Sequence, residues 1–339
     1  QTCKTSRTGT SWPSVTHRLA SVNCLKELLN RTRRDSVRLS TSRTVWLWQD
    51  PVIDRTALQP RPAVVVILGD LTNECKAEEF HLLDPILKEL QVPYFCVDGN
   101  HDVRNVAELE YFNRIYGSDS HLAGKVCLEP PLRGQRSYFI REIGPIVFVA
   151  IDSVLMCCNA GAPPEEFTTL AQDQYSWLEG ALPHVTARVE ELRASGPAAA
   201  VAVTHYPLFL ENEDEEGGGR EYFHWPVHHR RKIIGLLESA GVRHVLAAHT
   251  HTTTPPISAR NGLTVSTTGG TSVLLHPAFP RHWWAHPSGQ DPFGAHAFKI
   301  CGLNRHGVLE EEAVKLTAGL DGAHKAVAAI LQRCNQDAS

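Results

Sequence analysis

The sequence predicts an α/β sandwich in a single domain, and two observations carry that prediction. First, short apolar runs alternate with helical patterns from residue 63 to about residue 250, and further apolar runs follow up to residue 303. Second, four of the apolar runs lead directly into Asp, Asn or His. Ligands bind at strand ends in open α/β sheets, so the sequence also predicts a site at one sheet edge.

The elements follow in a regular order, which apolar runs and helical spacing define. Residues 76–91 give a clear helix, because Phe80, Leu83 and Leu87 share one face. Gly144-Pro145 separates two runs that we expect to form a hairpin, and Pro183 is expected to break its helix. Strands are expected over 44–48, 63–68, 92–98, 137–141, 146–151, 198–203, 242–248, 263–268 and 297–303, and helices over 76–91, 105–116, 172–192, 228–240 and 323–334.

The composition is that of a folded, soluble protein. The chain has 339 residues, 42% of them hydrophobic and 21% charged, so we expect a sizeable core and at most two domains. The formal net charge of −4 gives no reason to expect a nucleic-acid partner, and no apolar run reaches the roughly 18 residues that span a membrane. Nine cysteines without a repeating spacing favour reduced thiols and a cytoplasmic setting.

The first 45 residues differ in composition from the rest. They are rich in Lys, Arg, Ser and Thr, and Glu27 and Asp35 are their acidic residues. We expect a basic, disordered tail here, with a transit-like peptide or an incorrect gene start as the alternatives. Residues 46–310 would then form the main domain, and residues 311–339 a helical C-terminal extension.

The polar residues at the strand ends have the chemistry of metal ligands. They are Asp70, Asn100, His205, His249 and His251. Carboxylate, amide and imidazole groups that converge on one edge predict a divalent metal site, and a carboxylate can bridge two ions. Two metals about 3.5–4 Å apart can clamp a phosphate and share the hydroxide that attacks phosphorus.

His101 has the placement of an acid–base catalyst. It lies between Asn100 and Asp102 in the sequence. A His that does not bind the metal can protonate the leaving oxygen of a phosphate ester. A carboxylate beside an imidazole fixes its tautomer and raises its pKa, so we expect His101 and Asp102 to act as a catalytic pair.

In order and spacing these residues resemble the motifs of the calcineurin-like metallophosphoesterases. Each residue alone has an ordinary explanation as a helix cap, turn or loop residue, but the joint order of four motifs argues against chance. The resemblance covers roughly residues 63–305 and rests on Gly69-Asp70, Gly99 to Asp102, Thr204-His205 and His249 to His251. Residues 171–178, 205–211 and 230–242 further resemble a subgroup described as acting on phosphoserine and phosphothreonine proteins.

The resemblance implies a four-layer α/β/β/α sandwich and a role for each site residue. Asp70 would bridge two divalent ions of the Mn, Fe or Zn type. Asn100, His205 and His249 would hold one ion, and His251 would hold the other. His101 would be the general acid.

Two positions depart from the family pattern. Ala248 stands where the family usually has Gly, which is a minor change. The first metal motif, normally Asp-x-His or Asp-x-Gln after the first strand, is missing, because Asp50 and Asp54 lack a His or Gln two residues on. We therefore expect one complete metal site and one that is half-built.

The expected function is metal-dependent hydrolysis of phosphomonoesters, on a small molecule or on phosphorylated Ser or Thr of a protein. A cyclic-nucleotide phosphodiesterase shares the ligand set and is the alternative enzyme. A weakly active or inactive metal-binding scaffold is the third possibility. Glu211 to Glu216 is expected to be a solvated mobile loop unless it covers the metal edge, and residues 276–296 either line the substrate pocket or pack between layers.

Overall fold

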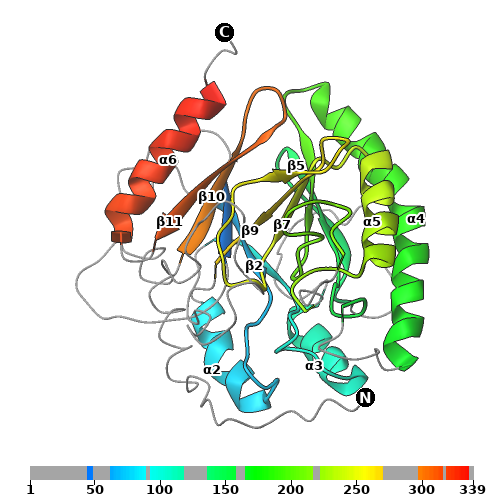
Figure 1. Ribbon diagram of the computed structural model, residues 1–339. Helices are drawn as coiled ribbons and strands as arrows, with labels where there is room; N and C mark the ends of the chain where they lie inside the picture. The colour runs from blue at the N-terminus through cyan, green and yellow to red at the C-terminus, as the bar shows by residue number, and fades with distance from the viewer. Residues whose placement is uncertain are drawn as a thin grey trace.

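Two β-sheets face each other at the centre of the molecule, and helices cover the outer face of each (Figure 1). This is the four-layer α/β/β/α sandwich expected from the sequence. The computed structural model describes residues 44–48, 62–88, 92–117, 136–157, 165–216, 222–269, 297–315 and 318–335. The basic tail and the aromatic 276–296 segment lie outside these residues, so the predictions for them stay predictions.

The first sheet has five strands in the order β11-β10-β1-β2-β3. Along β2, Val64 and Val66 pack against the second sheet, whereas Val65 and Ile67 belong to the core under the helices, because successive side chains point to opposite faces. The helices on this side are α2 (Ala77–Lys88), α3 (Val106–Tyr116) and α6 (Gly319–Asn335). The strands are β1 (Thr44–Trp48), β2 (Pro62–Leu68), β3 (Tyr94–Val97), β10 (Ala297–Leu303) and β11 (Leu309–Lys315).

The second sheet has six strands in the order β4-β5-β6-β7-β9-β8, with α4 (Glu165–Arg193) and α5 (Val227–Ser239) outside it. The central strands β5, β6, β7 and β9 are parallel to one another, so their carboxyl ends meet at one edge. Because β2 and β3 are also parallel, each sheet delivers its strand-end residues to one edge. The strands are β4 (Phe139–Ile143), β5 (Ile146–Ala150), β6 (Ala199–Val203), β7 (His244–Ala247), β8 (Ile257–Ser258) and β9 (Thr264–Thr267).

Strand β1 runs in the opposite direction to β2. Thr44 pairs with Ile67 and Trp48 pairs with Pro62, so β1 ends at the edge of the sheet opposite to Asp70. Antiparallel pairing needs no crossover helix, which agrees with the prolines between the two strands. The candidate ligands Asp50 and Asp54 lie outside the described residues, but the strand before them leads away from the metal edge.

All the predicted strands and helices are present, with three corrections. The break expected at Pro183 is wrong, since α4 continues through it: Leu182 and Val185 on either side are buried, and the carbonyl that Pro183 leaves without a partner belongs to exposed Glu179. Strands β8 and β11 are additional. β11 pairs with β10 up to Lys315, so the sheet runs into the region expected to be helical, and the C-terminal helix begins at Gly319.

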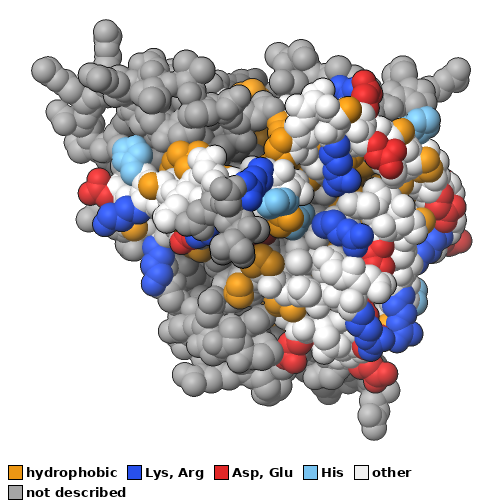
Figure 2. All heavy atoms as spheres, turned by 90° about the horizontal axis from the view of Figure 1, so that it is seen from above, with side chains coloured by type: hydrophobic (Ala, Val, Ile, Leu, Met, Phe, Trp, Pro, Cys, Tyr) orange, Lys and Arg blue, Asp and Glu red, His pale blue; other side chains and the backbone are white. Residues whose placement is uncertain are grey.

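The face at the top of the molecule in the view of Figure 1 carries both positive and negative side chains. Lys, Arg, Asp and Glu side chains are interspersed over the described part of this face (Figure 2). Within the described residues, no helix is both long and apolar enough to cross a membrane. In the same part of the chain, Cys75, Cys96, Cys301 and Cys334 are free thiols.

Candidate metal centre

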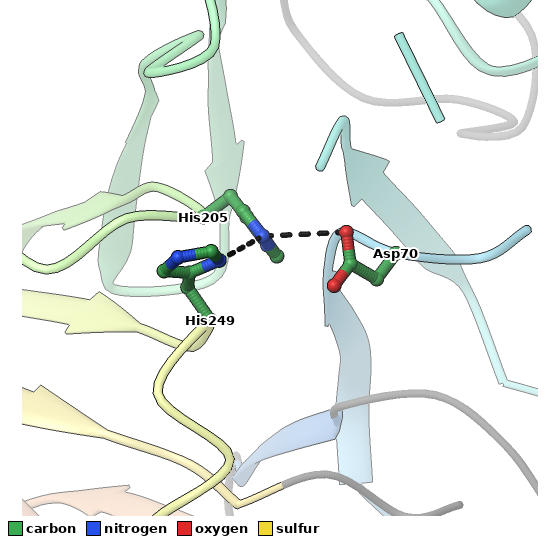
Figure 3. Close-up of side chains that lie close together, drawn as sticks. All are labelled: Asp70, His205 and His249. Carbon is green, nitrogen blue, oxygen red and sulfur yellow. Dashed lines mark hydrogen bonds and ion pairs between the residues drawn. The ribbon is translucent and has the colours of Figure 1, made fainter. Parts of the chain in front are cut away.

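Four predicted ligands converge on one point between the two sheets. Nε2 of His205 lies 3.0 Å from Oδ1 of Asn100, 3.3 Å from Oδ1 of Asp70 and 3.2 Å from Nδ1 of His249 (Figure 3). Ligand atoms about 2.1 Å from a shared ion lie roughly 3.0–3.4 Å from one another in octahedral or tetrahedral geometry. The observed separations therefore fit one divalent cation.

The main chain sets the tautomer of both imidazoles. Nδ1 of His205 lies 2.7 Å from the carbonyl oxygen of Leu68, and Nε2 of His249 lies 2.7 Å from that of Tyr222. A carbonyl can only accept, so these two nitrogens carry the protons. Nε2 of His205 and Nδ1 of His249 keep their lone pairs, and these are the nitrogens that face Asp70 and Asn100. Metal-bound imidazoles are oriented in this way in proteins.

Two glycines allow the motifs from neighbouring strands to meet. A Cβ on Gly69 would lie 2.6 Å from Nδ1 of His205, and Gly69 also has a φ of +84°. A Cβ on Gly99 would collide with the main-chain nitrogen and the carboxylate of Asp70. Both positions therefore require Gly, which explains why the Gly69-Asp70 and Gly99-Asn100 motifs occur together.

Three predicted ligands adopt a left-handed backbone conformation. The φ angles are 57° for Asp70, 62° for His249 and 56° for His251. Non-glycine residues in this region cost on the order of 1–3 kcal/mol each and persist where the surrounding structure imposes them. Asp70 and His249 belong to the cluster of close ligand atoms, together with His205, but His251 does not belong to it in the described part of the chain.

His101 lies beside the ligands without joining them. Its main-chain nitrogen donates to Oδ1 of Asp70 at 3.1 Å, and its Nδ1 lies 2.9 Å from the carbonyl oxygen of Asn73. The carbonyl of Asn73, rather than Asp102, therefore fixes the tautomer. His101 remains half-buried, whereas His205 and Asn100 are buried.

Asp102 holds the loop after β2 in place by hydrogen bonds. Its carboxylate accepts hydrogen bonds from the main-chain nitrogens of Leu71, Thr72 and Gly99 at 3.1, 2.7 and 3.0 Å, and from the hydroxyl of Thr72 at 2.9 Å. Burial, with a smaller contribution from Asp70, raises the pKa of Asp102 to about 6. The expected contact between Asp102 and the ring of His101 is thus replaced by contacts that hold the loop carrying Asp70.

Two buried carboxyl groups near the site were not predicted from the sequence. Asp98, directly before Gly99, is fully buried, and burial together with Asp152 raises the pKa of Asp98 well above its usual range. Asp152 accepts a hydrogen bond from Ser137 and from the main-chain nitrogen of Leu155. The two acids come from different sheets, so they bridge the two layers beneath the metal ligands.

The acidic run after His205 is held to the protein rather than loosely solvated. Arg230 is fully buried, and its guanidinium donates to the carbonyl oxygens of Glu213, Glu215 and Trp225 at 3.0, 2.8 and 2.9 Å. Tyr222, later in the same segment, provides the carbonyl that orients His249. The alternative prediction, that Glu211 to Glu216 covers the metal edge, stays a prediction.

Four histidines outside the motifs make structural contacts. His224 receives a hydrogen bond from Arg230, His229 contacts the hydroxyl of Tyr175 at 2.6 Å, and His244 accepts from the main-chain nitrogen of Leu309. His228 packs its ring on His229. None of the four belongs to the ligand cluster among the described residues.

Comparisons with known proteins agree with the geometry of the site. The family model described as "Calcineurin-like phosphoesterase" matches residues 42–253. The bovine serine/threonine-protein phosphatase CPPED1 is 27% identical over 207 residues, which cover 57% of this chain and 55% of that protein. The probable glycerophosphodiester phosphodiesterase GpdQ of Arcobacter nitrofigilis is 32% identical over 87 residues, covering 20% of this chain and 32% of the relative.

A solved structure supports the fold. The structure titled "GAP50 the anchor in the inner membrane complex of Plasmodium" superimposes with a TM-score of 0.50 at 12% identity and covers 94% of this chain and 91% of that one. At this identity the likeness concerns the fold alone. The chain spans about half the length of the curated phosphatase that it matches.

Proposed function

This chain belongs to the calcineurin-like phosphoesterase family, and on that basis we propose that it is a metal-dependent hydrolase of phosphomonoesters. One observation carries the proposal: Asp70, Asn100, His205 and His249 converge at 3.0–3.3 Å with both imidazole lone pairs directed at the same point. Phosphoserine and phosphothreonine in proteins are the substrate class we favour, because a relative bears the name of a serine/threonine-protein phosphatase.

The donor set fits one divalent ion of the Mn, Fe or Zn type. A carboxylate oxygen, an amide oxygen and two imidazole nitrogens match the preferences of these metals. When bound, such an ion would polarise the phosphoryl oxygens and lower the pKa of water. We assign one resident ion to these four ligands. The described residues add no comparable set around His251 for a second ion.

The protein's own groups orient the substrate and move the proton. Leu68 and Tyr222 hold the two imidazoles by their carbonyls, and Asp102 holds the loop that carries Asp70. His101 is fixed at its main chain by Asp70 and at Nδ1 by Asn73, so its Nε2 is the nitrogen that exchanges a proton. We propose that it protonates the leaving oxygen of the ester.

The test is hydrolysis of p-nitrophenyl phosphate and of a phosphoserine peptide by the Mn²⁺-loaded protein. Asp70→Asn is the control, because it removes the negative charge of a metal ligand without changing the size of the side chain. Activity in the parent and its loss in the variant would support the proposal. A fully Mn²⁺-loaded parent that leaves both substrates intact would refute it and favour the alternative of a metal-binding scaffold.

A phosphodiesterase is the second candidate. The observation in its favour is the match to a relative named as a probable glycerophosphodiester phosphodiesterase. Bis(p-nitrophenyl) phosphate and a cyclic nucleotide, compared with p-nitrophenyl phosphate under the same conditions, separate the two classes. A higher kcat/KM for a diester than for the monoester would replace our first proposal with this one.

A further inference from the structure

Three aromatic rings surround the imidazole of His249. The ring centroid of Tyr206 lies 4.0 Å from that of His249, the ring of Tyr222 lies 4.9 Å away and the ring of Phe223 lies 5.9 Å away. Tyr206 and Phe223 are buried, with 1% and 2% of their surface exposed, whereas Tyr222 is 37% exposed. Tyr222 is therefore the member of this group that reaches solvent beside a metal ligand.

The two halves of Tyr222 face different partners. Its main-chain carbonyl accepts the proton of Nε2 of His249, which leaves Nδ1 for the metal. Its ring meets the imidazole at an interplanar angle of 52° and extends outward to solvent. Replacing the side chain therefore leaves the group that orients His249 in place.

The burial of the ligands determines where the organic part of a substrate lies. His205 and Asn100 are 0% and 4% exposed, so the ligand atoms are at the inner end of the site. A phosphoryl group at these ligands must direct its ester substituent toward solvent. The exposed ring of Tyr222 lies beside the metal ligand His249, so it is placed to meet an ester substituent that leaves the site on that side.

We propose that Tyr222 is a specificity-determining residue whose ring contacts the organic group of the phosphomonoester. It favours substrates with a planar or apolar group near the ester oxygen, such as aryl phosphates, over small polar alkyl phosphates. The inference rests on the proposed function and goes beyond it, because it names the residue that contacts the organic group of the substrate.

The first experiment measures binding without turnover. Phenylphosphonate and methylphosphonate are titrated into the Mn²⁺-loaded full chain, and the ratio of their Kd values is compared between the parent, Tyr222→Ala and Tyr222→Phe. We expect the parent to prefer phenylphosphonate by about 3- to 10-fold, Tyr222→Phe to keep that preference and Tyr222→Ala to lose it. The bound metal, counted per chain, should be the same in all three proteins.

Val308→Ala provides the matched control. Val308 is 43% exposed and lies in the turn between β10 and β11, away from the strand ends that carry the ligands. Equal weakening of both phosphonates in Tyr222→Ala would assign the side chain a role in supporting His249 and overturn the proposal. An unchanged ratio in Tyr222→Ala would overturn it too.

Kinetics provide the second readout. For p-nitrophenyl phosphate against glycerol 2-phosphate, Tyr222→Ala should raise KM for the aryl ester about 3- to 10-fold and leave the glycerol ester nearly unchanged. A chain that shows the phosphonate preference but hydrolyses neither ester would refute the proposed function and leave the role of Tyr222 in binding supported. The two conclusions can therefore fail separately.

Discussion

The contacts of His101 separate acid–base chemistry from metal binding. Asp70 receives a hydrogen bond from the main chain of His101, and this contact survives any change of the His101 side chain. The ring itself is anchored at Nδ1 by the carbonyl of Asn73, and we assign the proton exchange to Nε2. A substitution at this position therefore tests the proton transfer alone.

We expect His101→Ala to keep its bound metal and to lose about 10²- to 10⁴-fold in kcat, the range typical of general acid–base catalysis. Asp70→Asn should instead lose metal. Bound metal counted per chain, with kcat measured at saturating substrate, checks both expectations. If His101→Ala released the ion, His101 would be a ligand and the assignment of roles would be wrong.

At the scale of single residues, the sequence predicts which residues bind the metal better than it predicts which hydrogen bonds they form. Asp70, Asn100, His205 and His249 converge as their positions at strand ends predict. Asp102 shows the limit, since its adjacency to His101 suggested a pair, whereas its carboxylate accepts the hydrogen bonds described above from Leu71, Thr72 and Gly99. A carboxylate binds the donors that its backbone turn presents, and sequence adjacency does not determine that turn.

At the scale of elements, the segment between β6 and α5 connects a buried cation to the metal ligands. Arg230 holds three carbonyl oxygens of this segment, and Trp225 donates from its indole to the carbonyl of Tyr206 at 2.9 Å. The segment in turn presents the carbonyl of Tyr222 to His249. Arg230 is thus a positioning residue that acts on His249 through the main chain.

We expect Arg230→Met to weaken metal affinity by about 10- to 100-fold, as for other groups that orient a ligand. Arg231→Met is the matched control, because Arg231 is 66% exposed and meets Asp214 at 3.4 Å on the surface. Metal Kd values are measured well below the melting temperature of each variant. Equal affinity in both variants, with Arg230→Met still folded, would remove Arg230 from the site.

The direction of β1 has a consequence for the number of metals. Trp48 ends the strand beside Pro62, at the opposite edge from Asp70, so this strand does not deliver a ligand pair to the site. We expect one tightly bound divalent ion per chain after dialysis, and loss of activity on chelation that the same metal restores. Two ions of similar affinity would show that residues beyond the described ligands complete a second site.

At the scale of the whole molecule, a neutral histidine links the two sheets. Nε2 of His244 on β7 accepts from the main-chain nitrogen of Leu309 on β11 at 3.1 Å, and Nδ1 lies 3.0 Å from the hydroxyl of Thr264. Burial lowers the pKa of His244 more than Glu310 and Glu311 raise it. Burial, with His228 and Lys232, also lowers the pKa of His229 to about 4.

These shifts predict that acid destabilises the fold through the two histidines. Their pKa values in the folded protein lie below the unfolded value of about 6.5, so the unfolded chain binds more protons below pH 6.5, and for His229 this range extends down to about pH 4. Their contribution to stability is complete above pH 6.5 and is lost as the pH falls toward 4. The buried acids Asp98 and Asp152 have raised pKa values and act in the opposite sense.

The test therefore compares the loss of stability on acidification between two proteins. The free energy of unfolding is determined by urea titration at pH 7.5 and 5.0 for the parent and for the double variant His229→Gln/His244→Gln. We expect a smaller loss of stability on acidification in the double variant than in the parent. Equal losses in the two proteins would show that other groups determine the acid response.

The sequence predicts the layers of the molecule but not the direction of every strand. Runs such as 63–68 and 198–203 are buried on both faces and leave little doubt about their structure. The antiparallel course of β1 depends on long-range pairing with β2 and β10, which local pattern does not encode. β11 was not predicted, because three consecutive Glu residues, Glu310 to Glu312, interrupt the alternation of apolar and polar residues that marks a strand. Glu311 is nevertheless buried, in an ion pair with Lys299.

The close packing at Gly99 has a consequence for how this sequence can diverge. A side chain at Gly99 would displace Asp70 whether or not a metal is bound, so selection for folding alone preserves the glycine. A randomised library screened only for soluble expression should return Gly at that position, even in a parent made inactive by His101→Ala. Retention of this glycine among divergent descendants therefore shows that the fold is kept, and not that the activity is kept. Substitution of the neighbouring His101 is the change that would indicate a lost activity.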